Sequence, residues 1–315
     1  MKRFITGLLL MPLFVTAQKP TPQFFDIDWK ACDAGMARYV AIVKKTDSGW
    51  LRTDYYLSNN NIQMAGLFAD STCKTEDGWF HYFYPDGKLS SYGKYVQGKK
   101  QGLWLGYHSN GMMKDSSFYE NGKITGISLS WYNNGFLADS MFRQDDGYVV
   151  NAGWFSNGNP SYAGRFYDKK REGVWQFFHI GGNLAAKETY VHGNITDSSY
   201  FDEEGKPVAK KVYENSSAVF KGGEKAWRKY LGNRLVFPNN YKLVNTDQMI
   251  VVVAAIIDED GNVTDAWVDI PFKPPFDYEA LRAFKKSPKW QPSTQHNRRV
   301  MQIVRQPITF SQVEE

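Results

Sequence analysis

The chain has few of the residues and motifs on which enzymes and metalloproteins depend. Its 315 residues include two cysteines and five histidines, and the histidines show no HxH or HExxH spacing. It has no Gly-x-Ser-x-Gly elbow and no phosphate-binding Gly-Lys-Ser/Thr loop. We therefore expect no catalytic residue, no cofactor and no metal site, and interpret the protein as a non-enzyme. An enzyme would instead require an aromatic-lined cleft with a buried carboxylate or histidine of strongly shifted pKa.

Two features that resemble ion sites have simpler interpretations. Asp258 and Asp260 resemble the start of a calcium loop, but Val263 occupies the position of the required glycine, which favours a solvated hairpin turn. The basic pair Arg298-Arg299 and the run at 169–171 are interpreted as solvated loops.

Long apolar runs are also lacking. The apolar run at 5–15 is interrupted by Pro12, and its eleven residues fall short of the roughly 20 that cross a bilayer. It follows Lys2 and Arg3 and ends in Val15-Thr16-Ala17, a small-residue cleavage pattern. Residues 1–17 are thus predicted to be a cleaved signal peptide, which leaves no transmembrane helix in the mature chain. An uncleaved membrane anchor is the alternative.

Charge of one sign is not in marked excess. The formal charge of +5 falls to +3 without Lys2 and Arg3. Residues 18–217 carry 22 basic and 22 acidic side chains, and residues 218–315 carry 14 and 11. This balance excludes the basic surface of a nucleic-acid-binding protein.

Cys32 and Cys73 are 41 residues apart and form no CxxC motif, which argues against a metal or redox site. Both lie in the part of the chain that is expected to be exported. An oxidising compartment would permit a disulfide between them, and the alternative is two free thiols.

Glycine, by contrast, is abundant and periodic. Six glycines follow one another at spacings of 24, 24, 23, 24 and 23 residues, and an aromatic residue stands four positions before each. Asn-Gly and Asp-Gly steps supply the positive φ angles of tight hairpin turns. The period predicts a stack of β-hairpins, each of which buries its apolar face against the next. The glycines are Gly87, Gly111, Gly135, Gly158, Gly182 and Gly205, and the aromatics are Phe83, Tyr107, Trp131, Trp154, Phe178 and Phe201.

The repeats resemble the MORN-repeat variant of bacterial envelope proteins, on the evidence of their length, their Asn-Gly turns and Gly-x-Trp entries such as Gly102-Leu103-Trp104. The resemblance covers about 54–208 and implies an interaction surface. Some relatives are labelled antitoxin-like. We expect residues 18–53 to cap the open end of the stack, with a short helix within 28–45, and 209–217 to be a polar linker.

The last hundred residues predict a small α+β domain. Helical spacing of apolar residues indicates helices at 224–235 and 276–286. A β-branched run at 249–257, an Asp-Gly turn and an alternating segment at 263–270 predict an antiparallel hairpin, and 300–310 supplies one more strand. The chain as a whole is therefore α+β: an all-β hairpin array followed by a two-helix, three-stranded antiparallel domain.

Residues 218–315 resemble the C-terminal domain of TonB-type proteins. The resemblance rests on landmarks in the family's order, which include Phe220-Lys221-Gly222-Gly223, Phe237-Pro238, Pro288-Lys289-Trp290-Gln291-Pro292 and Pro307-Ile308-Thr309-Phe310. It implies that an extended peptide of an outer-membrane transporter adds to the edge of the last strand. The implied docking edge is Val300, Met301, Gln302, Ile303, Val304, Arg305 and Gln306, with the even-numbered residues on one side of the pleat. A proline at Val304 is then expected to block docking and leave the fold largely intact.

Energy transduction by a TonB protein needs a membrane anchor and a long Pro-rich span, and the chain shows neither. We therefore interpret it as a non-enzymatic binding protein of the periplasm or cell envelope of a Gram-negative bacterium. Its partners are expected to be proteins, among them an outer-membrane transporter whose transport it supports. The alternative is a structural or antitoxin-like scaffold in which the repeats bind. The oligomeric state stays open.

Overall fold

The computed structural model describes residues 21–312, except 27, 36, 58, 240, 244–246 and 271. The predicted signal peptide at 1–17 lies outside the described residues. The chain divides into two compact units, Met1–Thr125 and Gly126–Glu315. The sixteen-stranded sheet and the C-terminal α+β region together confirm the predicted fold class. The boundaries at 53, 208 and 217 remain predictions.

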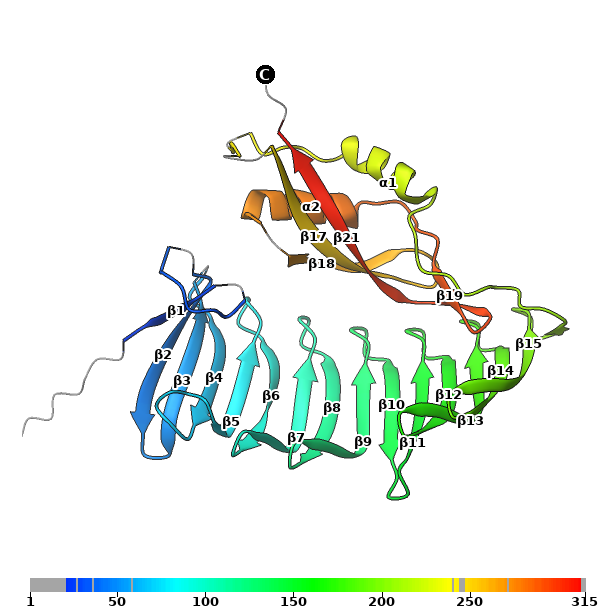
Figure 1. The fold of residues 1–315 in the computed structure, drawn as a ribbon, viewed down its shortest axis with the longest axis horizontal. Helices are drawn as coiled ribbons and strands as arrows, with labels where there is room; N and C mark the ends of the chain where they lie inside the picture. The colour runs from blue at the N-terminus through cyan, green and yellow to red at the C-terminus, as the bar shows by residue number, and fades with distance from the viewer. Residues whose placement is uncertain are drawn as a thin grey trace, which may run out of the picture. The chain divides into compact units, whose positions relative to one another are not determined.

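The hairpin array is an antiparallel meander in which every strand neighbours the next along the chain (Figure 1). It begins with β1, before the expected start of the repeats. The prediction of a short helix within 28–45 is wrong. Most of β2 lies in this stretch, and β2 pairs with β3 over eight residues. The strands β1 to β16 are Gln23–Phe25, Tyr39–Thr46, Gly49–Tyr56, Ile62–Phe68, Glu76–Phe83, Leu89–Val96, Lys99–Tyr107, Met113–Glu120, Lys123–Trp131, Leu137–Arg143, Tyr148–Trp154, Pro160–Tyr167, Lys170–Phe178, Leu184–Val191, Asn194–Phe201 and Pro207–Val208.

The periodic glycines lie in the turns, as predicted. All six have positive φ angles, between 83° and 94°. Their loops are longer than tight two-residue turns: Gly87 N–H donates to the Tyr84 carbonyl, and Tyr84 N–H donates to the Lys88 carbonyl. The two-residue turns lie at the opposite ends of the hairpins, for example at Gln97-Gly98 between the paired residues Val96 and Lys99.

A hydrogen bond repeated from hairpin to hairpin ties the loops together. The Tyr56, Tyr84 and Tyr132 hydroxyls donate to carbonyls in the next hairpin at 2.7–2.9 Å, those of Phe83, Tyr107 and Trp154. Burial raises the pKa of Tyr132 to about 12, so its hydroxyl keeps its proton. His179 occupies the same repeat position, and its Nε2 lies 3.1 Å from the Phe201 carbonyl oxygen. This histidine is therefore a structural ring of the array, as expected.

Glycines inside the strands make room for buried tryptophans. Trp175 is 1% exposed and its Nε1 donates to the Arg165 carbonyl at 3.0 Å. A Cβ at Gly164 would lie 2.1 Å from Trp175 Cδ2, too close for any side chain. Trp104 and Gly93 repeat this arrangement, also at 2.1 Å. The array thus builds small local cores in which a buried ring fills the space left by the glycine opposite it and packs with a few neighbouring apolar residues.

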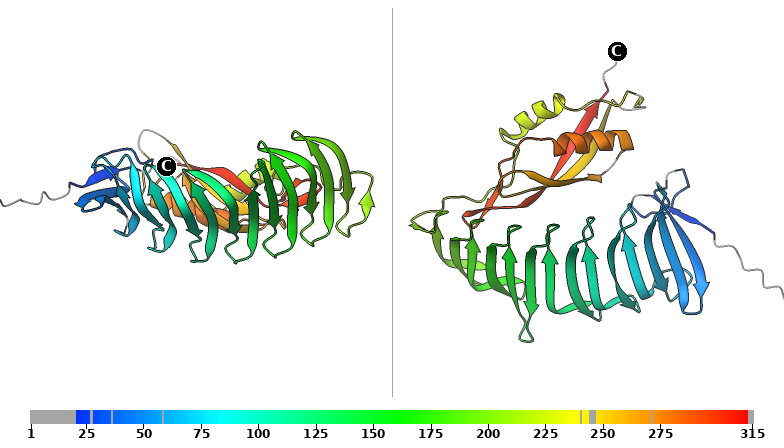
Figure 2. Two further views of the ribbon diagram at one scale, coloured as in Figure 1. Left: turned by 90° about the horizontal axis from the view of Figure 1, so that it is seen from below. Right: turned by 180° about the vertical axis from the view of Figure 1, so that it is seen from behind.

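The C-terminal domain has the predicted helices and strands. Its sheet runs in the order β18-β17-β21, and β17 pairs with β21 over ten residues without a register shift. A separate hairpin, β19–β20, precedes β21 (Figure 2). The elements are α1 (Gly223–Gly232), β17 (Gln248–Ile257), β18 (Val263–Ile270), α2 (Pro274–Lys285), β19 (Ser293–Gln295), β20 (Arg298–Val300) and β21 (Gln302–Ser311).

One contiguous core holds this domain together. The odd-numbered residues of β17 from Met249 to Ile257 are buried and pack with Trp227 of α1 and Phe284 of α2. Both helices therefore cover the same face of the sheet. The opposite face leaves Ile250 and Trp267 exposed by 53% and 38%.

Candidate functional site

The proposed docking residues lie at an edge of the C-terminal sheet. β21 pairs with β17 on one side, and no strand among the described residues pairs with its other side. Gln302 to Gln306 belong to β21, whereas Val300 ends β20 and Met301 lies between the two strands. An unpaired edge offers backbone donors and acceptors to an extended peptide.

Side chains alternate along β21 as the sequence predicted. Val304 is 8% exposed and faces the core, whereas Ile303 is 57% exposed on the other face. Arg305 is also exposed and forms an ion pair with Asp269 of β18, with Nε 3.2 Å from Oδ2.

Pro307 indicates which backbone groups of β21 are free. It lacks an N–H, yet the pairing with β17 continues through it without a shift. Proline is tolerated in a sheet where its nitrogen faces away from the neighbouring strand. Since these groups alternate along a strand, we infer that Ile303, Arg305 and Thr309 direct their N–H groups to the free edge, and that Val304 directs its own to β17.

This corrects the expectation for Val304. A proline there would remove a hydrogen bond to β17 and disturb a core side chain. Arg305 is the better position for a proline that blocks the edge.

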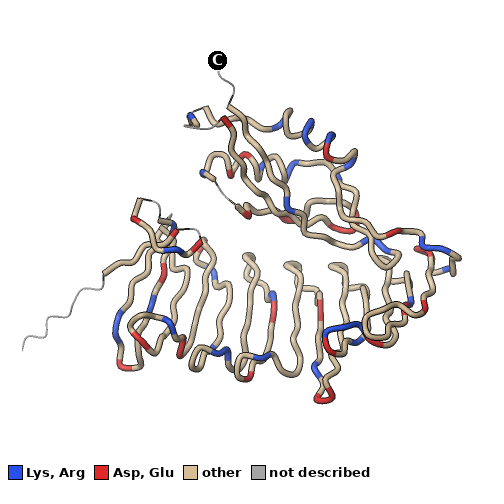
Figure 3. The backbone as a smooth tube through the Cα atoms, in the orientation of Figure 1, with Lys and Arg blue, Asp and Glu red and all other residues tan. Residues whose placement is uncertain are grey.

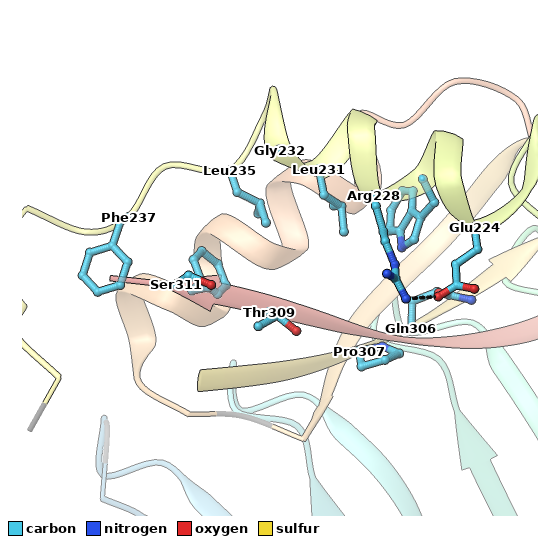
Figure 4. A pocket seen from close by; sticks show the side chains of 12 residues that line it. Glu224, Arg228, Leu231, Gly232, Leu235, Phe237, Gln306, Pro307, Thr309 and Ser311 are labelled. Atoms are coloured by element: carbon cyan, nitrogen blue, oxygen red, sulfur yellow. Dashed lines mark hydrogen bonds and ion pairs between the residues drawn. The ribbon is translucent and has the colours of Figure 1, made fainter. Parts of the chain in front are cut away.

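A groove of about 700 Å³ runs between α1 and β21 (Figure 4). Leu231 and Leu235 of α1 give it an apolar wall, and Thr309 and Gln306 line it from β21. Glu224 and Arg228, one helical turn apart, form an ion pair at one end. An added strand would place alternate side chains toward this groove.

Trp227 supplies a polar feature next to the groove. Its side chain lines the groove and is 4% exposed, and its Nε1 has no hydrogen-bond partner among the described residues. A buried N–H without an acceptor is costly.

The hairpin β19–β20 inserts its tip between residues that are distant in sequence. Asn297 is fully buried, and its Nδ2 donates to the carbonyls of Ala185 and Phe201 at 2.9 and 2.8 Å. Its Oδ1 accepts the backbone N–H of Val212 at 2.5 Å and that of Tyr213 at 3.1 Å. The residues expected to form a linker are therefore partly fixed by this one side chain.

His296 forms the other half of the hairpin tip. Its ring stacks on Phe177 with centroids 3.8 Å apart, Nδ1 lies 2.8 Å from Glu188 Oε2, and Nε2 lies 3.0 Å from Arg171 Nη1. Because an arginine only donates, Nε2 accepts and Nδ1–H donates, which assigns a neutral imidazole. Burial favours a raised pKa for Glu188, but the hydrogen bonds from His296 and Tyr190 outweigh it and lower this pKa.

Sequence reasoning missed this joint. Arg298, interpreted as a solvated loop residue, is 5% exposed, and that interpretation is wrong. Asn297 was the available sequence signal for a hairpin turn here, because asparagine tolerates the positive φ that both His296 and Asn297 adopt. Nothing local indicated that its tip is buried.

The other candidate features give no sign of a metal site or a membrane-spanning helix among the described residues. Cys32 and Cys73 are both partly exposed, and no bond joins them in the structure. A disulfide between them stays a prediction. Among residues 21–312 outside the gaps, no group of three His, Cys, Asp or Glu could hold a metal ion, and no helix is long and apolar enough to cross a membrane. Basic and acidic residues are interspersed along the described part of the backbone (Figure 3).

Comparison with protein families agrees with the architecture of the C-terminal domain. Residues 245–311 match the model described as Gram-negative bacterial TonB protein C-terminal. The chain carries a TonB-type C-terminal domain. The match includes all of β17, β18, α2 and β21, whereas α1 and the repeats lie outside it. No curated protein matches the chain.

The TonB C-terminal family is non-catalytic, belongs to envelope proteins of Gram-negative bacteria and interacts with proteins. A protein-interacting role in transport is therefore the function that the family indicates for this chain.

Proposed function

We propose that the TonB-type domain binds an extended peptide of an outer-membrane transporter as a fourth strand along β21. The observation that carries the proposal is the unpaired edge of β21 beside a groove of about 700 Å³. Main-chain hydrogen bonds to the edge supply affinity, and alternate side chains in the groove supply selectivity. The free N–H groups inferred for Ile303, Arg305 and Thr309 are the donors.

The hairpin array is an additional interaction surface in this proposal, and its MORN-type character remains part of the proposal. We place the mature chain in the periplasm or envelope after removal of residues 1–17. In this proposal the protein supports transport by binding its partner.

Site-specific photo-crosslinking in the full-length chain tests the docking edge. A benzophenone amino acid at Thr309, beside the groove, is expected to crosslink to the periplasmic segment of an outer-membrane transporter in intact cells. The same group at Tyr278, 66% exposed on α2, is the matched control and is expected to give no such product. Equal crosslinking at both positions, or no transporter peptide at Thr309, would contradict the proposal.

A proline variant separates docking from folding. Arg305→Pro removes an edge N–H from an exposed residue and is expected to abolish the Thr309 crosslink while thermal unfolding changes little. Val304→Pro is expected to lower stability directly. Retention of the crosslink in a folded Arg305→Pro protein would move the binding site elsewhere, with the repeats as the next candidate.

A further inference from the structure

A second cavity, separate from the groove between α1 and β21, lies within the unit formed by residues 126–315. Its volume is about 470 Å³, inside the range of about 300–1,000 Å³ typical of small-molecule sites. Strands β10 to β13 line one side, and the β19–β20 hairpin with the β17–β18 turn lines the other.

The wall of this cavity contains a buried guanidinium with unused donors. Arg298 donates from Nη1 to Ser161 Oγ at 2.7 Å and to the Phe178 carbonyl at 3.2 Å. Its Nε has no partner, and none of the ion pairs of the described residues includes it. Burial lowers the pKa of Arg298 to about 10, so the group is still charged at neutral pH. Three N–H groups, on Nε and Nη2, therefore have no acceptor among the described residues.

Acceptors line the same cavity from β10 and β11. Asp139 Oδ2 accepts from Asn151 Nδ2 at 2.8 Å and from the Tyr162 hydroxyl at 2.5 Å. These bonds hold both side chains in place and leave Asp139 Oδ1 and Asn151 Oδ1 without a donor among the described residues. The cavity thus presents fixed acceptors as well as donors.

The charges of the lining balance. The lining contains two basic residues, Arg171 and Arg298, and two acidic residues, Asp139 and Glu259. The hydrogen bonds of His296 assign it a neutral ring. Burial raises the pKa of Glu259, so the lining carries no net negative charge. A balanced site does not favour a strongly charged ligand. Hydroxyl groups, which both donate and accept, match its mixture of donors and acceptors.

Aromatic rings complete the wall. Trp154 lines the cavity and is partly exposed, whereas Phe155 and Phe177 are 2% and 1% exposed beneath Arg298. The ring of Trp154 offers a flat apolar surface to the C–H face of a cyclic ligand.

We propose that this cavity binds a neutral sugar. Arg298 donates to its hydroxyl groups, Asp139 and Asn151 accept from them, and Trp154 packs against its ring. The inference does not depend on peptide docking at β21, because the residues proposed to contact the sugar, Arg298, Asp139, Asn151 and Trp154, lie outside the docking edge; the two sites adjoin only at Val300 and Met301.

Calorimetric titration of the full chain tests the proposal. The probes are glucose, N-acetylglucosamine and their β-1,4-linked disaccharides, with glucuronate as the charged comparison. At least one neutral probe is expected to bind with a Kd below roughly 10 mM. Arg298→Lys and Trp154→Ala are each expected to weaken that binding at least tenfold, since lysine cannot reproduce the planar donor set of arginine.

Tyr107→Ala is the matched control, because Tyr107 holds the same repeat position as Trp154 and does not line the cavity. The Tyr107→Ala variant is expected to bind sugar with the same Kd as the unsubstituted chain. Thermal unfolding checks that each variant is folded. If Arg298→Lys does not fold, the NMR signal of Arg298 Nε–H in the unsubstituted chain is followed instead, and it is expected to shift when sugar is added. Absence of binding by every neutral probe, binding of glucuronate alone, or equal binding by folded Trp154→Ala would overturn the proposal.

Discussion

The hairpin array and the C-terminal domain bury their apolar side chains in different ways. The domain gathers both helices and all three strands of its main sheet around one contiguous core. The array has local clusters, such as Trp175, Phe177, Ala186 and Tyr190, joined by strand pairing and loop-to-loop hydrogen bonds. Stability in such an array is close to a sum of nearest-neighbour terms, whereas a single core is lost as a unit. Damage should therefore spread through the domain and stay local in the array.

The largest effect is expected from Phe284→Ala in the core of the domain. Phe284 is fully buried and its ring packs against Trp227 and Trp290 with centroids 5.3 and 5.4 Å away. Its removal should lower the free energy of unfolding of the domain by about 4 kcal/mol. Hydrogen exchange should accelerate along β17, β18 and β21 together. Tyr278→Ala, 66% exposed on the same helix, is the control, and loss of protection confined to α2 would contradict a single cooperative core.

Gly164→Ala tests the array in the same way. The new methyl group would overlap Trp175, at 2.1 Å, and should cost about 3 kcal/mol. We expect faster hydrogen exchange in β12 to β14 and unchanged protection in β17. Gly181→Ala is the control, because a Cβ there meets no atom within 4 Å. Loss of protection throughout β17 would show that the array and the domain unfold together.

Glu188→Gln tests the joint that links the two kinds of structure. Glu188 is 1% exposed and accepts from His296 and Tyr190, so loss of its charge should cost about 2 kcal/mol at neutral pH. Because its pKa is lowered from 4.5 on folding, its contribution is present above pH 4.5 and is lost as the pH falls through the lower folded value. Denaturant unfolding should show the variant and the unsubstituted chain converging in acid. The exposed Glu204→Gln should show no difference at either pH.

The smallest effect is expected from Tyr132→Phe, which removes one bond of the loop ladder. The hydroxyl donates to the Trp154 carbonyl at 2.9 Å, and its loss should cost about 1 kcal/mol. Tyr167→Phe, with a ring 45% exposed, is the control. Thermal unfolding of the two variants measures the difference, and equal midpoints would show that the ladder adds little to strand pairing.

Periodicity along the sequence was enough to predict the hairpin array, the positive φ of its turn glycines and the helices and strands of the C-terminal domain. These features depend on local backbone preferences and on apolar spacing, which neighbouring residues carry. The two-residue turns were missed because the stronger repeat glycines drew the interpretation to the other ends of the hairpins. Asn121-Gly122 was the visible signal for one of them.

The sequence by itself determined which segments form hairpins and which strand is last in the C-terminal domain. It also contained the motifs that identify this domain as TonB-type. Only the tertiary structure decided that β21 is an unpaired edge with Val304 facing the core, and that the tip of β19–β20 is buried. Asn297 is hydrogen-bonded to Val212, 85 positions away in the sequence, and Arg298 to Ser161, 137 positions away. Burial of a polar side chain depends on such distant partners, and local spacing does not encode them.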